Sequence, residues 1–137
     1  MKHFKRLSLI ILPLLFISCG MNMIEKDTKP EIKPVADKAV LVVLRTTSFG
    51  FAVVMDTYLD GKMIGQTQGK CYFITKVDPG EHYLMGESEN IATAKINFEA
   101  GKVYYLSQDV FMGEMKAQTG WEPESPEFAT EQIPECD

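Results

Sequence analysis

The sequence predicts an all-β protein built around a single antiparallel β-sandwich of about seven strands. Between residues 39 and 111, short runs of apolar, β-branched and aromatic residues alternate with turns that contain glycine. In the same span, apolar residues do not recur at intervals of three and four over a length that would form a major helix. We expect a short apolar helix before the sandwich and a short helical turn after it.

The expected strands follow one another closely. The first, Ala39–Arg45, is apolar up to its last residue, as expected for a strand that is covered on both faces. A second strand over 53–59 ends at Asp60-Gly61, a strong signal for a two-residue hairpin. Five further strands are expected, over 62–66, 70–77, 82–87, 92–98 and 103–111.

The segment Asp78-Pro79-Gly80-Glu81 has the residues of a tight turn, because proline fixes φ at its first central position and glycine accepts a positive φ at the next. With this turn as a hairpin, Val77 would face His82 across neighbouring strands. Near the end of the chain, Ser125-Pro126-Glu127 predicts a helix start that continues through Ile133. Residues 117–137 hold six acidic residues and no basic one, which is typical of a solvated, loose extension.

The first 18 residues have the pattern of an export signal. Three basic residues lie within the first six, and an apolar run over 7–17 follows them. Eleven residues are too few to cross a hydrocarbon core as a helix, which takes roughly 20 residues. We therefore expect residues 1–18 to form a cleaved signal helix.

The end of this segment, Ser18-Cys19-Gly20, resembles the lipobox of bacterial lipoproteins, in which a small residue precedes the cysteine that receives a lipid. Phe16 departs from the leucine usual in that motif. The resemblance implies lipidation of Cys19, and Gly20 in place of Asp implies the outer membrane in a bacterium that has one. The alternative is ordinary cleavage near Gly20, which would leave the protein without a lipid.

The mature chain divides into three parts on this interpretation. Residues 19–38, with prolines and six charged residues before Val35, read as a lipidated cysteine and a flexible tether. The sandwich domain covers 39–120, and an acidic extension covers 121–137. Loss of the three basic residues of the signal leaves 11 basic and 19 acidic residues, a net charge of −8, which disfavours binding to nucleic acid.

Three segments in this order resemble a known family, the domain of unknown function 2846. They are Tyr58-Leu59-Asp60-Gly61-Lys62-Met63-Ile64-Gly65, Val77-Asp78-Pro79-Gly80-Glu81-His82 and Glu99-Ala100-Gly101-Lys102-Val103-Tyr104-Tyr105-Leu106. The resemblance covers roughly 39–120 and includes Arg45. The family occurs in small bacterial lipoproteins and is similar to PEGA-type and prealbumin-like sandwich modules. It implies a fold and an envelope location, and it implies no activity or catalytic residue.

The residues predict no catalytic or metal site, and no cofactor is expected. His82 is the only histidine after the signal, and a zinc site needs several converging ligands. In the expected hairpin, Cys71 lies six residues from Val77, about 20 Å from His82 at ~3.3 Å per residue, which is too far for a nucleophile and its base. Asp60 and Asp78 occupy turn positions that favour aspartate for its geometry, so calcium binding is not predicted.

Cys71 and Cys136 are the two cysteines that remain if Cys19 carries a lipid. In an oxidising compartment they could form a disulfide that pins the tail to the sandwich. The alternative is a buried Cys71 and a free Cys136 in a loose end.

The aromatic residues offer the remaining candidate for binding. Most are expected in the core or in cross-strand pairs, and a subset on an exposed face could contact a glycan or a protein. The candidates are Tyr58, Tyr72, Tyr104 and Trp121.

Together these features favour a non-catalytic lipoprotein of the cell envelope, whose sandwich mediates interaction or support at the membrane surface. A module that binds a glycan or a small ligand through exposed aromatics is the alternative. The partners expected are the membrane, through the lipid on Cys19, and an envelope protein or cell-wall glycan.

Overall fold

The structure is a computed structural model that describes residues 31–112 and 117–136. The expected signal helix, Cys19 and the first part of the expected tether lie outside the described residues.

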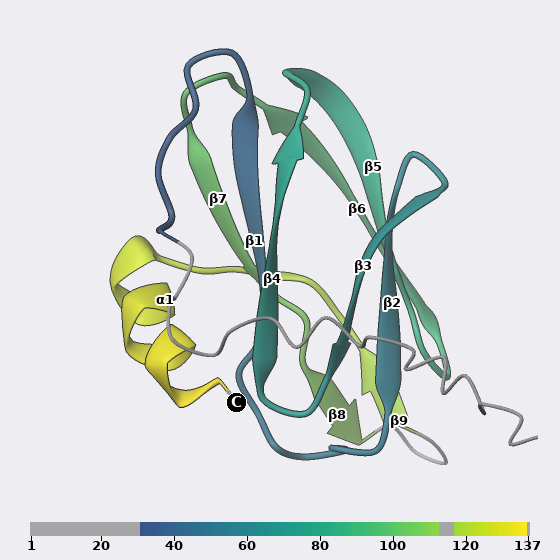
Figure 1. Ribbon diagram of the computed structural model, residues 1–137. Helices are drawn as coiled ribbons and strands as arrows, with labels where there is room; N and C mark the ends of the chain where they lie inside the picture. The colour runs from purple at the N-terminus through teal and green to yellow at the C-terminus, as the bar shows by residue number, and fades with distance from the viewer. Residues whose placement is uncertain (1–30, 113–116, 137) are drawn as a thin grey trace, which may run out of the picture. The chain divides into compact units, whose positions relative to one another are not determined.

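The described residues form two four-stranded sheets that pack face to face (Figure 1). The first sheet has the strand order β10-β7-β1-β4 and the second the order β3-β2-β5-β6, while β8 and β9 form a separate pair. In chain order the strands are β1 (Ala39–Arg45), β2 (Val54–Leu59), β3 (Lys62–Gln68), β4 (Cys71–Val77), β5 (Gly80–Glu87), β6 (Ile91–Phe98), β7 (Val103–Ser107), β8 (Val110–Met112), β9 (Ala117–Thr119) and β10 (Glu122–Pro123). The prediction of an all-β fold is confirmed.

The strand pairs are antiparallel with one exception, because β1 pairs in parallel with β7 on one side and antiparallel with β4 on the other. One prediction about strand pairing is wrong. The segment 78–81 does not close a hairpin, because the strands it joins belong to different sheets: β4 pairs with β1, and β5 pairs with β2 and β6. Residues 78–81 therefore carry the chain from one sheet to the other.

The hairpin between β2 and β3 is confirmed. Asp60 and Gly61 both have positive φ, 49° and 79°, as the tight turn of a two-residue hairpin requires. The expected strand over 103–111 instead divides into β7 and β8, which pair with different partners.

The space between the two sheets holds the main hydrophobic core. Every second residue of β1, from Ala39 to Val43, packs there with residues of the opposite sheet such as Leu84 and Phe98. This alternation is what the period of two in a strand dictates.

A second cluster covers the outer face of the first sheet. Helix α1 (Pro126–Gln132) and the short 3-10 helix η1 (Ile133–Glu135) place Ala129 and Ile133 against Val42 and Leu44 of β1, so β1 is buried on both faces. The helix begins as expected, with the Phe128 amide donating to Ser125 Oγ at 3.1 Å.

The chain boundaries predicted from composition are therefore corrected. Residues 121–136 are part of the folded unit and not a loose tail, since β10 pairs with β7 and α1 packs on the sheet. Ile32 and Val35 also pack on this second cluster, so the end of the expected tether belongs to the domain. Both clusters are built from residues 32–133, so this part of the chain holds the core of one compact unit.

Within the described ranges, no helix has the length and apolar character that crossing a membrane requires.

Candidate functional site

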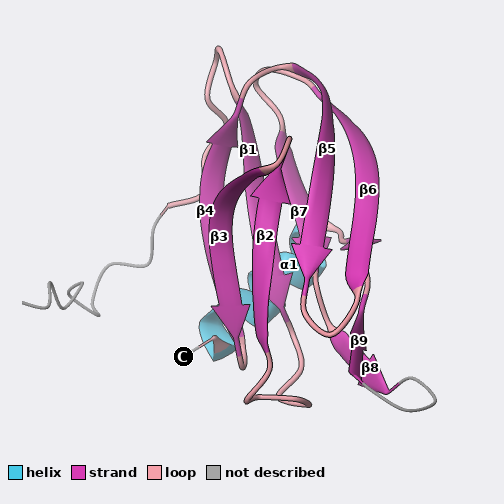
Figure 2. Cartoon of the chain, turned by 90° about the vertical axis from the view of Figure 1, so that its right-hand side faces the viewer, coloured by secondary structure: helices cyan, strands magenta, loops and turns pink. Residues whose placement is uncertain are grey.

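Three segments meet at one end of the sandwich, which we call the loop end: residues 46–54, 88–91 and 108–120, the last without 113–116 (Figures 1 and 2). Asn90 joins two of them, because its Nδ2 donates to the Thr119 carbonyl at 3.0 Å and its Oδ1 accepts from the Thr119 amide at 2.6 Å. The fold therefore brings together loops that are far apart in the sequence.

Arg45, the last residue of β1, fixes the loop 46–53 through hydrogen bonds to the loop backbone. Its side chain is fully buried, with Nη1 donating to the Val53 carbonyl at 2.5 Å and Nη2 donating to the carbonyls of Gly50 at 2.6 Å and Phe49 at 3.3 Å. Burial lowers the pKa of Arg45, and the nearby Cys71 and Asp109 oppose that shift. The charge of the guanidinium is thus stabilised mainly by hydrogen bonds to backbone carbonyls.

Gly50 is needed at the tip of this loop for two reasons. Its φ of 65° lies in the left-handed region, and a Cβ there would stand 3.1 Å from Cγ1 of Val110. The loop therefore lies directly against β8.

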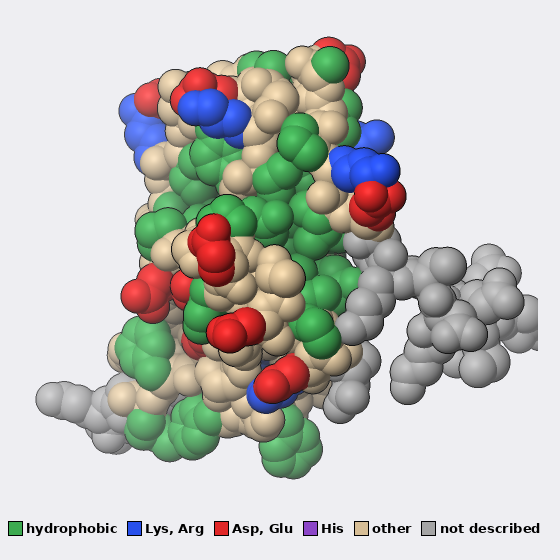
Figure 3. Space-filling view, turned by 90° about the vertical axis from the view of Figure 1, so that its left-hand side faces the viewer, with side chains coloured by type: hydrophobic (Ala, Val, Ile, Leu, Met, Phe, Trp, Pro, Cys, Tyr) green, Lys and Arg blue, Asp and Glu red, His purple; other side chains and the backbone are tan. Residues whose placement is uncertain are grey.

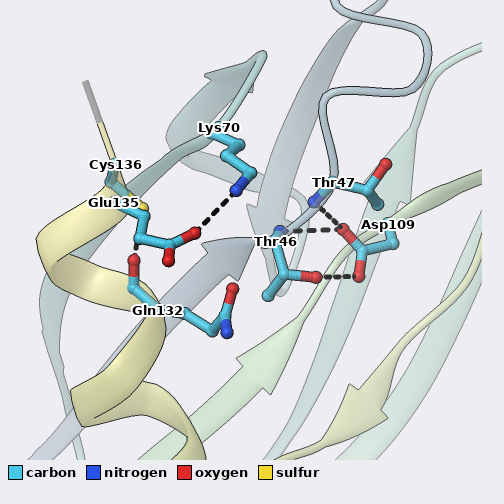
Figure 4. A network of polar contacts seen from close by, with 7 residues as sticks. All are labelled: Thr46, Thr47, Lys70, Asp109, Gln132, Glu135 and Cys136. Carbon is cyan, nitrogen blue, oxygen red and sulfur yellow. Dashed lines mark hydrogen bonds and ion pairs between the residues drawn. The ribbon is translucent and has the colours of Figure 1, made fainter.

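Asp109 fixes the other side of the same loop (Figure 4). Its carboxylate accepts from the Thr46 amide at 2.8 Å, the Thr46 hydroxyl at 2.6 Å and the Thr47 amide at 3.2 Å. Together with Arg45, it makes the backbone of the loop a pre-organised platform.

Large apolar side chains project from this platform. Eight large hydrophobic residues are exposed among the described ones, and six of them lie at the loop end: Phe49, Phe51, Val54, Ile91, Phe111 and Met112. Phe51 is 73% exposed and Met112 is 69% exposed. The space-filling view shows hydrophobic side chains at this lower end, below the acidic side chains of the helical layer (Figure 3).

A hollow of about 320 Å³ lies beside the loop end, lined by Ser107, Asp109, Phe111, Gly120, Trp121 and Glu122. Trp121 is one of these lining residues, and its Nε1 donates a hydrogen bond to the Ala92 carbonyl at 3.2 Å. Asp109 lines the hollow but already accepts three hydrogen bonds from residues 46 and 47.

The four aromatic residues predicted as a binding set do not gather on one face. Tyr58 lies on the outer face of the second sheet, Tyr72 under the helical layer, and Tyr104 in the core between the sheets. Trp121 alone lines the hollow. Alternation within strands places neighbouring residues on opposite faces, but the sequence does not show which face a helix covers.

The exposed phenylalanines at 49, 51 and 111 were not among the candidates from sequence. Phe111 was expected in the strand over 103–111, and Phe49 and Phe51 lie between the strands expected over 39–45 and 53–59. A signal was nevertheless present, because two phenylalanines within the five residues 47–51 are unusual for a solvated loop.

Cys71 and Cys136 are not bonded to each other in the structure. Cys71 lies opposite Arg45 in the antiparallel pair of β4 and β1. Its Sγ accepts a hydrogen bond from the Gln68 amide at 3.3 Å. Cys136 donates from Sγ to the Gln132 carbonyl at 3.6 Å and contributes to the raised pKa of Tyr72, which burial mainly causes. Tyr72 and Cys71 are consecutive in β4 and point to opposite faces, which explains why the two sulfurs do not join.

The ion pair Lys70–Glu135, at 2.8 Å, ties the end of the chain to the start of β4 in place of that disulfide (Figure 4). The hydrogen bond from Lys70 lowers the pKa of Glu135. Because both side chains are partly exposed, this pair contributes little stability.

His82 is engaged in local structure. Its Nδ1 contacts Asp60 Oδ2 at 2.5 Å and its Nε2 contacts the Asp78 carbonyl at 3.0 Å, so both ring nitrogens have partners. The pKa of Asp60 is lowered, first by the hydrogen bond from the Tyr83 amide and then by His82. This cluster links the β2–β3 hairpin to the segment that joins the sheets, and it leaves no ring nitrogen to act as a base.

In the described part of the chain, no three His, Cys, Asp or Glu side chains come together as metal ligands. The expectation that the protein holds no metal and no cofactor stays a prediction.

Comparison with known proteins identifies the family of the chain. The family described as "Protein of unknown function (DUF2846)" matches residues 35–121, which is more than half of the chain. The chain belongs to the DUF2846 family. An uncharacterized protein of Haemophilus influenzae is 30% identical over 120 residues, covering 80% of this chain and 71% of that protein. No solved structure matches the chain. The DUF2846 match includes Arg45, Asp109 and Trp121, so the whole loop end lies inside the shared region.

Proposed function

We propose that the protein is a non-catalytic lipoprotein of the cell envelope, whose sandwich mediates interaction or support at a membrane surface. The observation that carries the proposal is the segment Ser18-Cys19-Gly20 at the end of a basic and then apolar leader. The folded unit begins at Glu31, only 12 residues after Cys19. Acyl chains on Cys19 would therefore hold the domain close to the bilayer, since each buried methylene contributes ~0.8 kcal/mol.

The polar side chains that could act in catalysis are already hydrogen-bonded within the protein, which supports a non-catalytic role. Arg45 and Asp109 are used to hold a loop, and both nitrogens of His82 have partners. Such groups stabilise a surface and do not present a nucleophile or a base to a substrate.

The test is membrane fractionation of cells that express the full chain, with labelled palmitate as the precursor. The wild-type protein is expected in the membrane fraction and labelled, and Cys19→Ala is expected to lose both. Cys136→Ala is the matched control and should keep both. A Cys19→Ala protein that remains labelled and membrane-bound would refute lipidation at this residue.

The membrane that receives the protein can be tested in the same cells. In a double-membraned bacterium we propose the outer membrane, because Gly20 follows the lipidated cysteine. Separation of the two membranes should place the wild type in the outer fraction and Gly20→Asp in the inner one. Recovery of both in the inner membrane would contradict this part of the proposal.

The hollow beside Trp121 favours a second candidate, the binding of a cell-wall glycan or another small ligand. Its volume of about 320 Å³ and its two aromatic walls, Phe111 and Trp121, suit a sugar ring. Titration with soluble cell-wall glycan fragments should then change the fluorescence of Trp121, the only tryptophan. The variant Glu122→Ala, which alters the lining, should weaken the response, whereas Tyr83→Ala should not.

A further inference from the structure

The distribution of exposed apolar residues is uneven. Six of the eight large exposed hydrophobic residues among the described ones lie at the loop end, including Phe49, Phe51 and Phe111. The other two, Met63 and Tyr83, lie on strands of the second sheet. A soluble domain gains nothing from three exposed phenylalanines at one end unless a partner covers them.

We propose that the loop end docks directly on the surface of a lipid bilayer, with Phe49, Phe51 and Phe111 inserted among the lipids. This deepens the proposed function and rests on it, because the lipid anchor brings the domain to the membrane. It assigns to the sandwich a second membrane contact that is made by its own side chains.

The hydrogen bonding of the loop fits an apolar environment. The carbonyls of Phe49, Gly50 and Val53 accept from Arg45, and the Val53 amide donates to the Gly50 carbonyl at 2.8 Å. The Phe49 amide donates to Thr47 Oγ1 at 2.8 Å. These backbone groups have partners inside the protein, so they need not lose a bond to water on entering the interface, where an unsatisfied group is costly.

The amides of Thr46 and Thr47 complete the pattern, because both donate to the carboxylate of Asp109. A surface built to bind a protein would instead offer free donors and acceptors around an apolar centre. The loop end offers apolar tips on a backbone in which these amides and carbonyls are already paired.

The charges of the loop end also favour a zwitterionic lipid surface. The described segments 46–54, 88–91, 108–112 and 117–120 contain no Lys or Arg, and their acidic residues are Glu89 and Asp109. Lys70, in the β3–β4 turn at the same end, forms an ion pair with Glu135. Attraction to anionic headgroups needs clustered basic residues. The docking is therefore hydrophobic, and it should suit zwitterionic lipid better than anionic lipid.

The length of chain before the domain permits this arrangement. Glu31 lies 12 residues after Cys19, which spans at most about 43 Å at 3.3–3.6 Å per residue. A lipid on Cys19 thus keeps the domain near the bilayer, so that a weak contact of the loop end is enough to orient it.

The experiment uses the polypeptide from residue 20 to 137 without acyl chains, because residues 32–133 contain the complete core. Co-sedimentation with phosphatidylcholine vesicles at millimolar lipid should show partitioning. The variant Phe51→Ser should reduce the partition coefficient by about tenfold, which corresponds to 1.4 kcal/mol and to partial burial of one Phe side chain. Phe111→Ser should reduce it similarly.

The control variant is Tyr83→Ser, which removes an aromatic side chain that is 59% exposed on the second sheet. It should leave partitioning unchanged. A second measurement uses the fluorescence of Phe51→Trp and Tyr83→Trp, after subtraction of the Trp121 signal. Lipids brominated on their acyl chains should quench the fluorescence of the tryptophan at position 51 and not that at position 83.

Three results would overturn the proposal. The first is no partitioning into zwitterionic vesicles, or partitioning only when anionic lipid is added. The second is an equal loss with Phe51→Ser and Tyr83→Ser. The third is a concentration-dependent dimer, without lipid, that Phe51→Ser abolishes, since the occupant would then be a second copy of the chain. None of these bears on lipidation of Cys19, because the polypeptide tested has no lipid.

Discussion

Replacement of Arg45 by methionine is expected to loosen the loop end and to destabilise the domain by about 3 kcal/mol. Three hydrogen bonds from the guanidinium are lost, to the carbonyls of Phe49, Gly50 and Val53. Hydrogen bonds to a charged group contribute ~1.5–3 kcal/mol each, a total of about 5–9 kcal/mol for three. Burial of the guanidinium costs several kcal/mol, and methionine removes that cost. The expected loss of stability is the contribution of the three hydrogen bonds minus the cost of burying the guanidinium.

Urea unfolding measures this difference. With an m-value of about 1.5 kcal/mol/M, a loss of 3 kcal/mol lowers the midpoint by about 2 M. Arg45→Lys is the control, because lysine keeps the charge but cannot reproduce the fork of donors. We expect it to be at least as destabilising as methionine, since a buried ammonium would lack most of the bonds. A midpoint within 0.3 M of the wild type for Arg45→Met would refute the reasoning, because the three bonds would then only balance the cost of burial.

Three further predictions concern other parts of the domain. Because the folded-state pKa of Asp60 is lowered, its contribution to stability is present above pH ~3.8 and is lost as pH falls through the folded pKa; the stability difference between wild type and Asp60→Asn should therefore shrink below that pH. Gly86→Ala should destabilise the domain by about 1–3 kcal/mol and alter the fluorescence of Trp121, since a Cβ would stand 3.0 Å from Cζ2 of Trp121 and 2.3 Å from the Gln108 amide nitrogen. Thiol counting on the denatured polypeptide from residue 20, without reductant, should find both Cys71 and Cys136.

Each of these has a clear contrary outcome. An Asp60→Asn difference that stays constant between pH 6 and pH 3 would show that the carboxylate charge does not matter there. Gly86→Ala with wild-type stability and fluorescence would mean that Gln108 and Trp121 move aside at no cost. A count of zero thiols would show that the two cysteines form a disulfide after all.

Much of the fold follows from local sequence patterns. The apolar run of β1, the Asp60-Gly61 turn and the Ser125-Pro126 helix start are each set by a few neighbouring residues. Their physical causes are short-range: backbone sterics at a turn, alternation along a strand and capping of a helix. Such features are predicted well because no distant contact is needed to decide them.

The loop end could not be predicted in this way. Arg45 reads as a charged residue at the end of a strand, and only the fold brings it under residues 49–53 and beside Asp109. Composition suggested a loose acidic tail, whereas Ala129 packs into a cluster that buries the second face of β1. Charge along a helix describes its solvated face and says little about the few apolar residues on the other face.

The sequence by itself determined most of the strands, the Asp60-Gly61 turn and the helix start at Ser125, because each depends on residues that are adjacent in the chain. Only the tertiary structure decided that β1 pairs in parallel with β7, that Cys71 and Tyr72 face opposite sides of a covered sheet, and that the exposed phenylalanines share one end. The physical reason is that pairing and burial depend on contacts between residues far apart in the chain, such as Val40 and Val103 or Thr46 and Asp109, each pair 63 positions apart. Their geometry is set by how the two sheets and the helical layer pack, which no local pattern records.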